Sequence, residues 1–189
     1  KNGVNRFSTF IDDNDNDRIK LNTNLSTKIY KENILFVGMN KNVIIKPDVE
    51  TEEYFNFYYS HCSAGITNVK GFRKVTYENV YDNIDLVFHS YKNKLKYDFV
   101  VKPGGEVSDI KLKFSSADKL NVTEDGKLDS FNPFGQFESD ELFTYQSDGE
   151  EVKSFYYKNK NGTICIKTED YDKSKTLIID PYFIYTTYY

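Results

Sequence analysis

The sequence is poor in the residues that build catalytic centres. Its 189 residues include no Trp, one Met, four Pro and two His. A metal site that relies on nitrogen ligands, or a nucleophile that needs a histidine base, therefore has few residues to draw on. Neither a P-loop nor a Gly-rich dinucleotide motif occurs. We expect a protein that is not an enzyme, with no catalytic residue and no cofactor.

Long apolar runs and clusters of basic residues are also missing. No apolar run approaches the ~18 residues that a transmembrane helix requires. The net charge is −4, and Lys and Arg are spread along the chain. A nucleic-acid-binding protein would concentrate them in one patch. We therefore expect neither a membrane-spanning segment nor a nucleic-acid partner.

Cysteine is scarce as well. The chain has two cysteines, Cys62 and Cys165, and two is the smallest number that permits a disulfide bond. Their spacing fits neither a zinc site nor a redox pair. A bridge over such a long loop would stabilise the fold by about 4–5 kcal/mol on the loop-entropy model. The sequence leaves open whether the two are bridged or are unrelated thiols, and it places Cys165 on the polar face of a strand.

The abundant residues are aromatic, with 16 Tyr and 15 Phe. Both favour strands, and short apolar runs alternate with turn signals along the chain. Asp-Gly at 125–126, Asp-Gly at 148–149 and Asn-Gly at 161–162 each predict a hairpin. Residues 38–41 also resemble a hairpin turn, Pro47 a strand end, and residues 62–68 a loop. The prediction is an all-β, antiparallel, sandwich-like domain of about a dozen short strands with little or no helix.

The chain divides into a start and a main part. Residues 1–28 are polar and irregular, and residues 29–189 form the predicted β domain. A weak subdivision is placed near 61–70. Whether residues 1–60 share the core is left open.

An acidic stretch in the polar start resembles a calcium loop. Asp13, Asp15 and Asp17 occupy alternate positions, as hard oxygen ligands of Ca²⁺ do. However, Arg18 stands where the EF-hand turn needs Gly, and Asn24 stands where it needs Glu. A solvated acidic loop is the favoured interpretation, and any calcium bound here would be structural.

Three aspartates lie inside or at the end of predicted strands. A buried carboxylate needs partners, so each is interpreted structurally rather than as half of a hydrolase pair. Asp85 is expected to accept hydrogen bonds from backbone N–H groups of a neighbouring turn. Asp98 is expected to be solvated, and Asp180, before Pro181, to cap a turn.

Two aromatic clusters are candidates for binding sugar rings or protein partners. For the first we favour core packing, because a chain with no Trp must use Tyr and Phe inside. The second is a candidate interface with a following domain. The clusters consist of Tyr54, Phe55, Phe57, Tyr58 and Tyr59, and of Tyr182, Phe183, Tyr185, Tyr188 and Tyr189.

A long ordered motif runs from residue 75 to residue 181. Its most characteristic positions are Tyr77, Tyr81, Asp85, Tyr97, Asp98, Pro103, Gly104, Asp180 and Pro181. In this order the motif resembles the N-terminal domain, of uncharacterised function, of bacterial SBBP-repeat surface proteins. In those proteins the domain precedes a β-propeller of SBBP repeats. The resemblance implies a secreted or cell-surface location and supplies no catalytic residue.

The hypothesis from sequence is a non-enzymatic structural or interaction module of a large extracellular protein. It would pack against or present the following β-propeller, or contact other surface proteins, in adhesion or surface assembly. A carbohydrate-binding module that holds polysaccharide with exposed Tyr and Phe is one alternative. A fibre subunit that exchanges strands with its neighbour is another.

Overall fold

The computed structural model describes residues 33–91, 94–114, 119–132, 135–139, 141–181 and 183–185. Within them lie fourteen strands and one short 3₁₀ turn, Val107–Asp109 (η1). All the strand pairs are antiparallel. The predicted all-β, antiparallel, sandwich-like class is confirmed.

The strands form three sheets. The first sheet runs in the order β1 (Ile34–Phe36), β6 (Lys111–Phe114), β12 (Ile164–Thr168), β11 (Ser154–Lys158). The second runs β10 (Phe143–Gln146), β13 (Leu177–Asp180), β5 (Lys94–Val101), β4 (Ile84–Tyr91), β3 (Cys62–Tyr81), β2 (Ile44–Tyr59). The third runs β14 (Phe183–Tyr185), β9 (Gly135–Ser139), β8 (Leu128–Asn132), β7 (Lys119–Val122).

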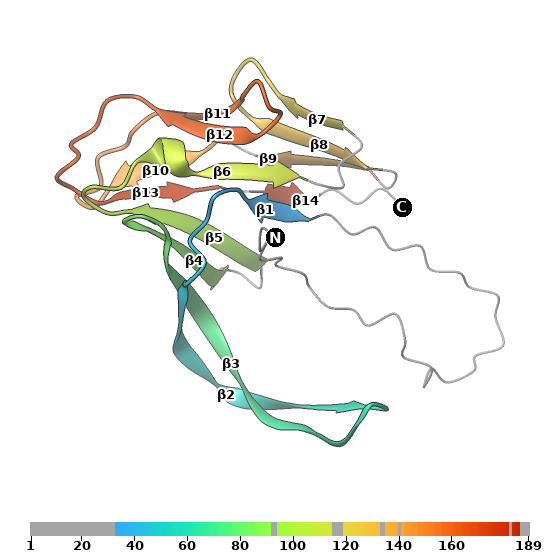
Figure 1. Cartoon of the computed structure of the whole chain (residues 1–189). Helices are drawn as coiled ribbons and strands as arrows, with labels where there is room; N and C mark the ends of the chain where they lie inside the picture. The colour runs from blue at the N-terminus through green and yellow to red at the C-terminus, as the bar shows by residue number, and fades with distance from the viewer. Residues whose placement is uncertain are drawn as a thin grey trace.

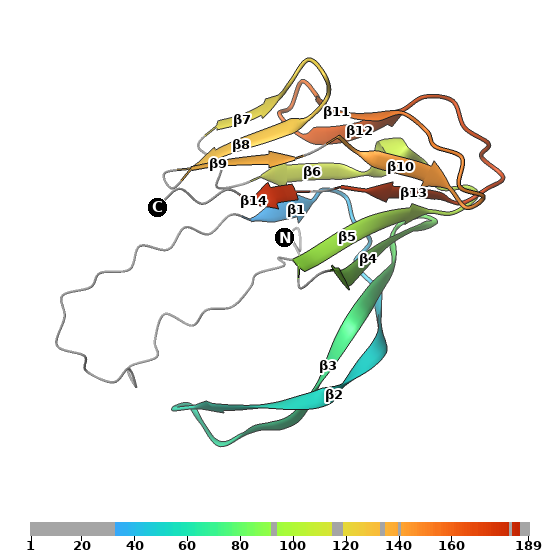
Figure 2. The ribbon, with the colours of Figure 1, turned by 180° about the vertical axis from the view of Figure 1, so that it is seen from behind.

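The core lies between the first two sheets, which are layered in both views (Figures 1 and 2). Alternating apolar residues supply it. Leu112 of β6 and Phe99 of β5 are fully buried, and the rings of Phe36 and Phe99 meet edge to face at 6.1 Å across the layers. Leu128 of β8, in the third sheet, belongs to the same hydrophobic cluster. Along residues 110–113 burial alternates, since Ile110 and Leu112 are fully buried and Lys113 is exposed.

Two of the three Gly-containing turns join paired strands as predicted. Gly126 and Gly162 have φ values of +78° and +77°, which L side chains rarely adopt. They join β7 to β8 and β11 to β12. At Gly149 the hairpin is short. After the bridge between Tyr145 and Glu151, the chain leaves the second sheet and enters the first.

Three local predictions before residue 70 are wrong. The turn at Gly38 does not make a hairpin, because β1 joins the first sheet and β2 the second. Pro47 lies inside β2, opposite Val75. Residues 62–68 belong to β3 and not to a loop. Pro47 is tolerated inside β2 because, among the described residues, β2 is an edge strand, whose outer N–H positions need no partner.

Candidate functional site

The most distinctive feature of the molecule is a two-stranded arm. β2 has 16 residues and β3 has 20, and their distal part projects away from the layered body in both views (Figures 1 and 2). β4 pairs with β3 from Lys74 onward. We define the arm as residues 50–72, the part of this hairpin in which β2 and β3 pair with each other and, among the described residues, with no third strand.

One face of the arm is apolar. Phe55 and Phe57 lie opposite Val69 and Ile66. The rings of Phe55, Phe57 and Tyr59 follow one another along β2 with centroids 6.4 Å apart, and the last two are parallel to within 2°. All three rings are exposed. This arrangement gives a row of exposed rings that can contact an apolar partner.

The opposite face carries Tyr54 and Tyr58. Tyr58 is 72% exposed, and its ring lies over Gly65. A Cβ on Gly65 would come within 2.8 Å of that ring. Gly65 also has φ +68°, so glycine serves both the backbone and the close approach. Apolar groups therefore lie on both faces of the arm.

The arm bends because the pairing register between its two strands shifts. The register shifts after Glu50 and again on either side of Phe57. Two non-glycine residues near these shifts have positive φ, Val49 at +54° and Asn68 at +58°. The Asn68 N–H donates to Asn56 Oδ1 at 3.0 Å. Bulges of this kind increase twist and re-aim side chains, and a β-branched residue at positive φ is a strained position.

Little within the arm stabilises it alone. Its cross-strand apolar pairs contribute ~0.2–1 kcal/mol each. The ion pair between Lys70 and Glu50, at 2.9 Å, is exposed, and such pairs contribute about 0–1 kcal/mol. An isolated two-stranded hairpin is marginally stable in water. The arm therefore has the composition of an element that gains stability when another surface covers it.

The interpretation of the first aromatic cluster as core is wrong. All five of its members are exposed: Tyr54, Phe55, Phe57, Tyr58 and Tyr59. Composition indicated that Tyr and Phe must fill the core, and residues such as Phe99 and Tyr156 do. The aromatic pattern itself does not separate the two sets, because both lie in alternating aromatic strands. Only the sheet order, which leaves β2 at an edge, exposes this one.

A second cluster is a charged row on the second sheet. His89 Nε2 lies 3.3 Å from Asp98 Oδ2, and Lys96 is ion-paired with Asp180. Ile179 pairs with Phe99, so Asp180 lies across from Asp98. Burial raises the pKa of the Asp98 carboxyl, an effect that His89 opposes and Asp180 reinforces. Each of the two carboxylates in the row therefore lies beside a basic side chain of the same sheet.

The predictions for the three strand aspartates have different outcomes. Asp85 is confirmed as an acceptor: its Oδ1 takes the Asn79 N–H at 2.9 Å, and its Oδ2 lies 2.7 Å from Lys102 Nζ. Asp98 is not solvated, since its side chain is 17% exposed. Its strand lies between β4 and β13, which supply its neighbours. Asp180 does not cap a turn, because its carboxylate reaches Lys96 across the sheet.

The remaining motif residues are structural. Tyr77 stacks edge to face on Phe88. The buried Tyr81 hydroxyl lies 3.3 Å from the Lys111 carbonyl, and burial raises its pKa to about 12. Tyr97 contacts Phe99 edge to face. The remaining motif positions are the exposed turn at Pro103 and Gly104, where Gly104 has φ +89°, and the buried Pro181.

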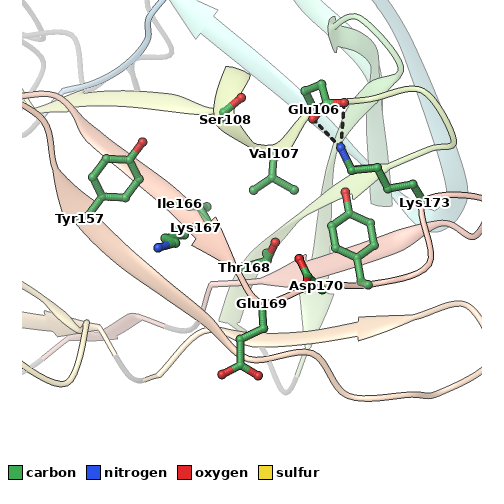
Figure 3. Close-up of a pocket in the computed structure, with 11 residues that line it drawn as sticks. Glu106, Val107, Ser108, Tyr157, Ile166, Lys167, Thr168, Glu169, Asp170 and Lys173 are labelled. Carbon is green, nitrogen blue, oxygen red and sulfur yellow. Dashed lines mark hydrogen bonds and ion pairs between the residues drawn. The ribbon is translucent and has the colours of Figure 1, made fainter.

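A groove of about 610 Å³ lies beside η1 (Figure 3). Tyr157 stands at one end, and the ion pair between Glu106 and Lys173, 3.0 Å to both carboxylate oxygens, closes the other. Hydroxyl groups of Ser108 and Thr168 line it. Hydrogen bonding to Glu106 raises the pKa of Lys173, so the lysine stays charged. Such a lining can hold a small polar ligand.

The other candidate residues are settled in part. Cys62 and Cys165 are free thiols, so the bridge is not formed. Cys165 is buried rather than on a polar face, because β12 is an inner strand. Asp13, Asp15 and Asp17 lie outside the described residues, as do the side chains of the terminal aromatic cluster: Tyr182, Phe183, Tyr185, Tyr188 and Tyr189.

The described part of the chain holds no group of three His, Cys, Asp or Glu side chains placed to bind a metal ion. It also holds no helix with the length and apolar character needed to cross a membrane.

These features define an antiparallel β-sandwich-like domain with a projecting aromatic arm. Residues 5–182 match the family described as a domain of unknown function, DUF7948, and the chain belongs to that family. Neither the search of curated proteins nor the search of solved structures returned a significant match.

Proposed function

We propose that this chain is a non-enzymatic contact module of a secreted or cell-surface protein, and that the arm is its contact element. The observation that carries the proposal is the uncovered aromatic surface of residues 50–72. Six aromatic side chains there are on average half exposed: Tyr54, Phe55, Phe57, Tyr58, Tyr59 and Phe72. At 150–250 Å² for a buried aromatic, they offer on the order of 600 Å² to a partner.

The resemblance to the N-terminal domains of SBBP-repeat proteins supplies the biological context. It supports an extracellular location and a following β-propeller as one partner, in adhesion or surface assembly. An arm with apolar groups on both faces suits a partner that embraces it, such as a cleft or a second arm, better than a flat surface. Aromatic anchors of this kind are typical binding hot spots.

A capture experiment tests the proposal. The purified chain would be passed over an immobilised SBBP-repeat β-propeller, the partner that the resemblance implies. Two arm variants remove one face each, Tyr54→Ser/Tyr58→Ser and Phe55→Ser/Phe57→Ser. We expect at least one of them to lose retention while its melting curve stays cooperative.

The matched control is Leu95→Ser. Leu95 is 74% exposed but lies on β5, outside the arm. Its substitution should leave retention unchanged. Equal retention of the wild type and both arm variants would refute the arm as contact element, as would the absence of any retention of the wild type.

Carbohydrate binding is the second candidate function. The specific observations that favour it are the parallel rings of Phe57 and Tyr59 and the groove lined by Tyr157, Ser108 and Thr168. Aromatic platforms contact sugar rings through their faces, and hydroxyls bond the sugar oxygens. The test is retention of the chain on insoluble polysaccharide. If Tyr157→Ala abolishes retention, the groove is the sugar-binding site. If Phe57→Ser abolishes it, the arm is the sugar-binding site.

A further inference from the structure

The outer edge of the arm contains an unusual segment. Residues 54–60 read Tyr-Phe-Asn-Phe-Tyr-Tyr-Ser and hold no charge, no Pro and no Gly. Its first five residues, Tyr54–Tyr58, form a palindrome about Asn56. Among the described residues β2 is the last strand of its sheet, so within that part of the chain this segment has backbone groups that no neighbouring strand pairs. Uncharged, aromatic edge strands are templates for pairing with another strand, and most proteins protect them.

We propose that the β2 edge of the arm pairs antiparallel with the β2 edge of a second copy of this chain, about a two-fold axis at Asn56. The proposal rests on the proposed function and names one partner of the arm. In this register, Phe55 of one copy faces Phe57 of the other, and Tyr54 faces Tyr58. Each aromatic residue of the palindrome then has an aromatic cross-strand neighbour, which is among the favourable pairings in antiparallel sheets.

The charges around the palindrome agree with this register. The acidic residues Glu52 and Glu53 immediately precede it. With the axis at Asn56, Glu53 falls opposite Tyr59 of the other copy and Glu52 opposite Ser60. No acid falls opposite an acid in this register. Like charges placed directly opposite each other would instead oppose pairing.

The other edge of the arm is less suited to self-pairing. In β3 it carries the cation Lys70 and two glycines, Gly65 and Gly71. Glycine weakens a strand, and the residues show no symmetry. A second copy is therefore matched by the β2 edge specifically.

The size of the surface is consistent with a dimer that forms and dissociates. Pairing along the β2 edge buries the flanks of its aromatic side chains and leaves much of both faces uncovered, so the contact is smaller than the ~800 Å² per partner of a standard interface. New backbone hydrogen bonds along the edge add to this. Because a two-fold contact is closed on itself, the product is a dimer with a four-stranded arm and not an open fibre.

Sedimentation equilibrium over a wide concentration range tests the proposal with a charge-exchange pair. Phe55→Lys/Phe57→Lys places lysine opposite lysine twice and should weaken dimerisation by at least about tenfold, that is ~1.4 kcal/mol. Phe55→Lys/Phe57→Glu removes the same two rings but places lysine opposite glutamate twice. It should dimerise more strongly than the first variant. Leu95→Lys should behave as the wild type.

A single substitution probes the axis itself. Asn56→Asp keeps an oxygen that can accept the Asn68 N–H, so the local fold is preserved. It also puts two carboxylates face to face at the axis. Dimerisation should be weakened at neutral pH and recover as the pH falls below the carboxyl range.

Three results would overturn the proposal. They are a wild-type chain that stays monomeric at the highest concentration, equal weakening by the two double variants, and no effect of Asn56→Asp. The proposed function fails separately. A monomeric wild type whose arm variants still lose the propeller would remove self-pairing and leave the arm as a contact element.

Discussion

Removing the hydroxyl of Tyr156 is expected to stabilise this protein, contrary to the usual effect of truncating a core side chain. Tyr156 projects from β11 into the core and is 2% exposed. Its hydroxyl oxygen is fully buried and has no hydrogen-bond partner among the described residues. Burial raises its pKa well above the ordinary tyrosine value, so the group is neutral. Phenylalanine keeps the ring and removes the unpaired polar atom.

The magnitude follows from the cost of burying an unpaired hydroxyl, about 1–3 kcal/mol. Part of it is offset by the small void left behind, so Tyr156→Phe should gain about 1 kcal/mol. Tyr81→Phe is the matched control. Tyr81 is 4% exposed, but its hydroxyl lies 3.3 Å from the Lys111 carbonyl. Losing that hydrogen bond should cost ~0.5–1.5 kcal/mol.

Thermal and urea unfolding of the three proteins would measure both effects. In a domain of this size each kcal/mol corresponds to a shift of about 2–4 °C in Tm. Tyr156→Phe should therefore melt above the wild type and Tyr81→Phe below it, with unchanged urea m-values. A loss of stability in Tyr156→Phe as large as that in Tyr81→Phe would show that the Tyr156 hydroxyl is satisfied, and would refute the reasoning.

Two further predictions concern other positions. Because burial raises the pKa of Asp98 in the folded protein, ionisation there costs stability as the pH rises through that pKa. Asp98→Asn should therefore be more stable than the wild type at pH 7 by a small margin. In a series of Tm measurements against pH, this margin should disappear near the ordinary carboxyl pKa. A margin that stays constant with pH would contradict the prediction. Gly126→Ala should destabilise by more than Gly149→Ala in urea, because both need positive φ at a cost of ~1 kcal/mol or more, but only at Gly126 would the new Cβ come within 2.8 Å of Phe155. Equal losses would show that strain alone decides.

Much of the body could be predicted from the sequence because its signals are local. The turn at Gly126 and the alternation along β5, with Phe99 inward and Asp98 on the other face, follow from turn chemistry and period-two patterning. That Asp85 accepts a backbone N–H was also predicted, although its donor, Asn79, lies in β3 and not in a turn. These features depend on neighbours in the chain.

The arm could not be predicted, because its character depends on sheet order. The same alternating aromatic pattern at Phe57 and at Phe99 gives an exposed strand in one case and a core strand in the other. Which of them lies at an edge is decided by non-local pairing. Pro47 was the one local signal, since a proline inside a strand favours an edge, but it was interpreted as a strand end.

Hydrogen exchange of the arm amides, residues 50–72, tests the central claim most directly. A two-stranded arm in water should exchange quickly in the dilute isolated chain. If the arm is a contact element, its amides should become protected when the SBBP-repeat propeller is added or at high chain concentration, while amides of β5 stay unchanged. Exchange in the arm that is equally fast under all three conditions would contradict the account.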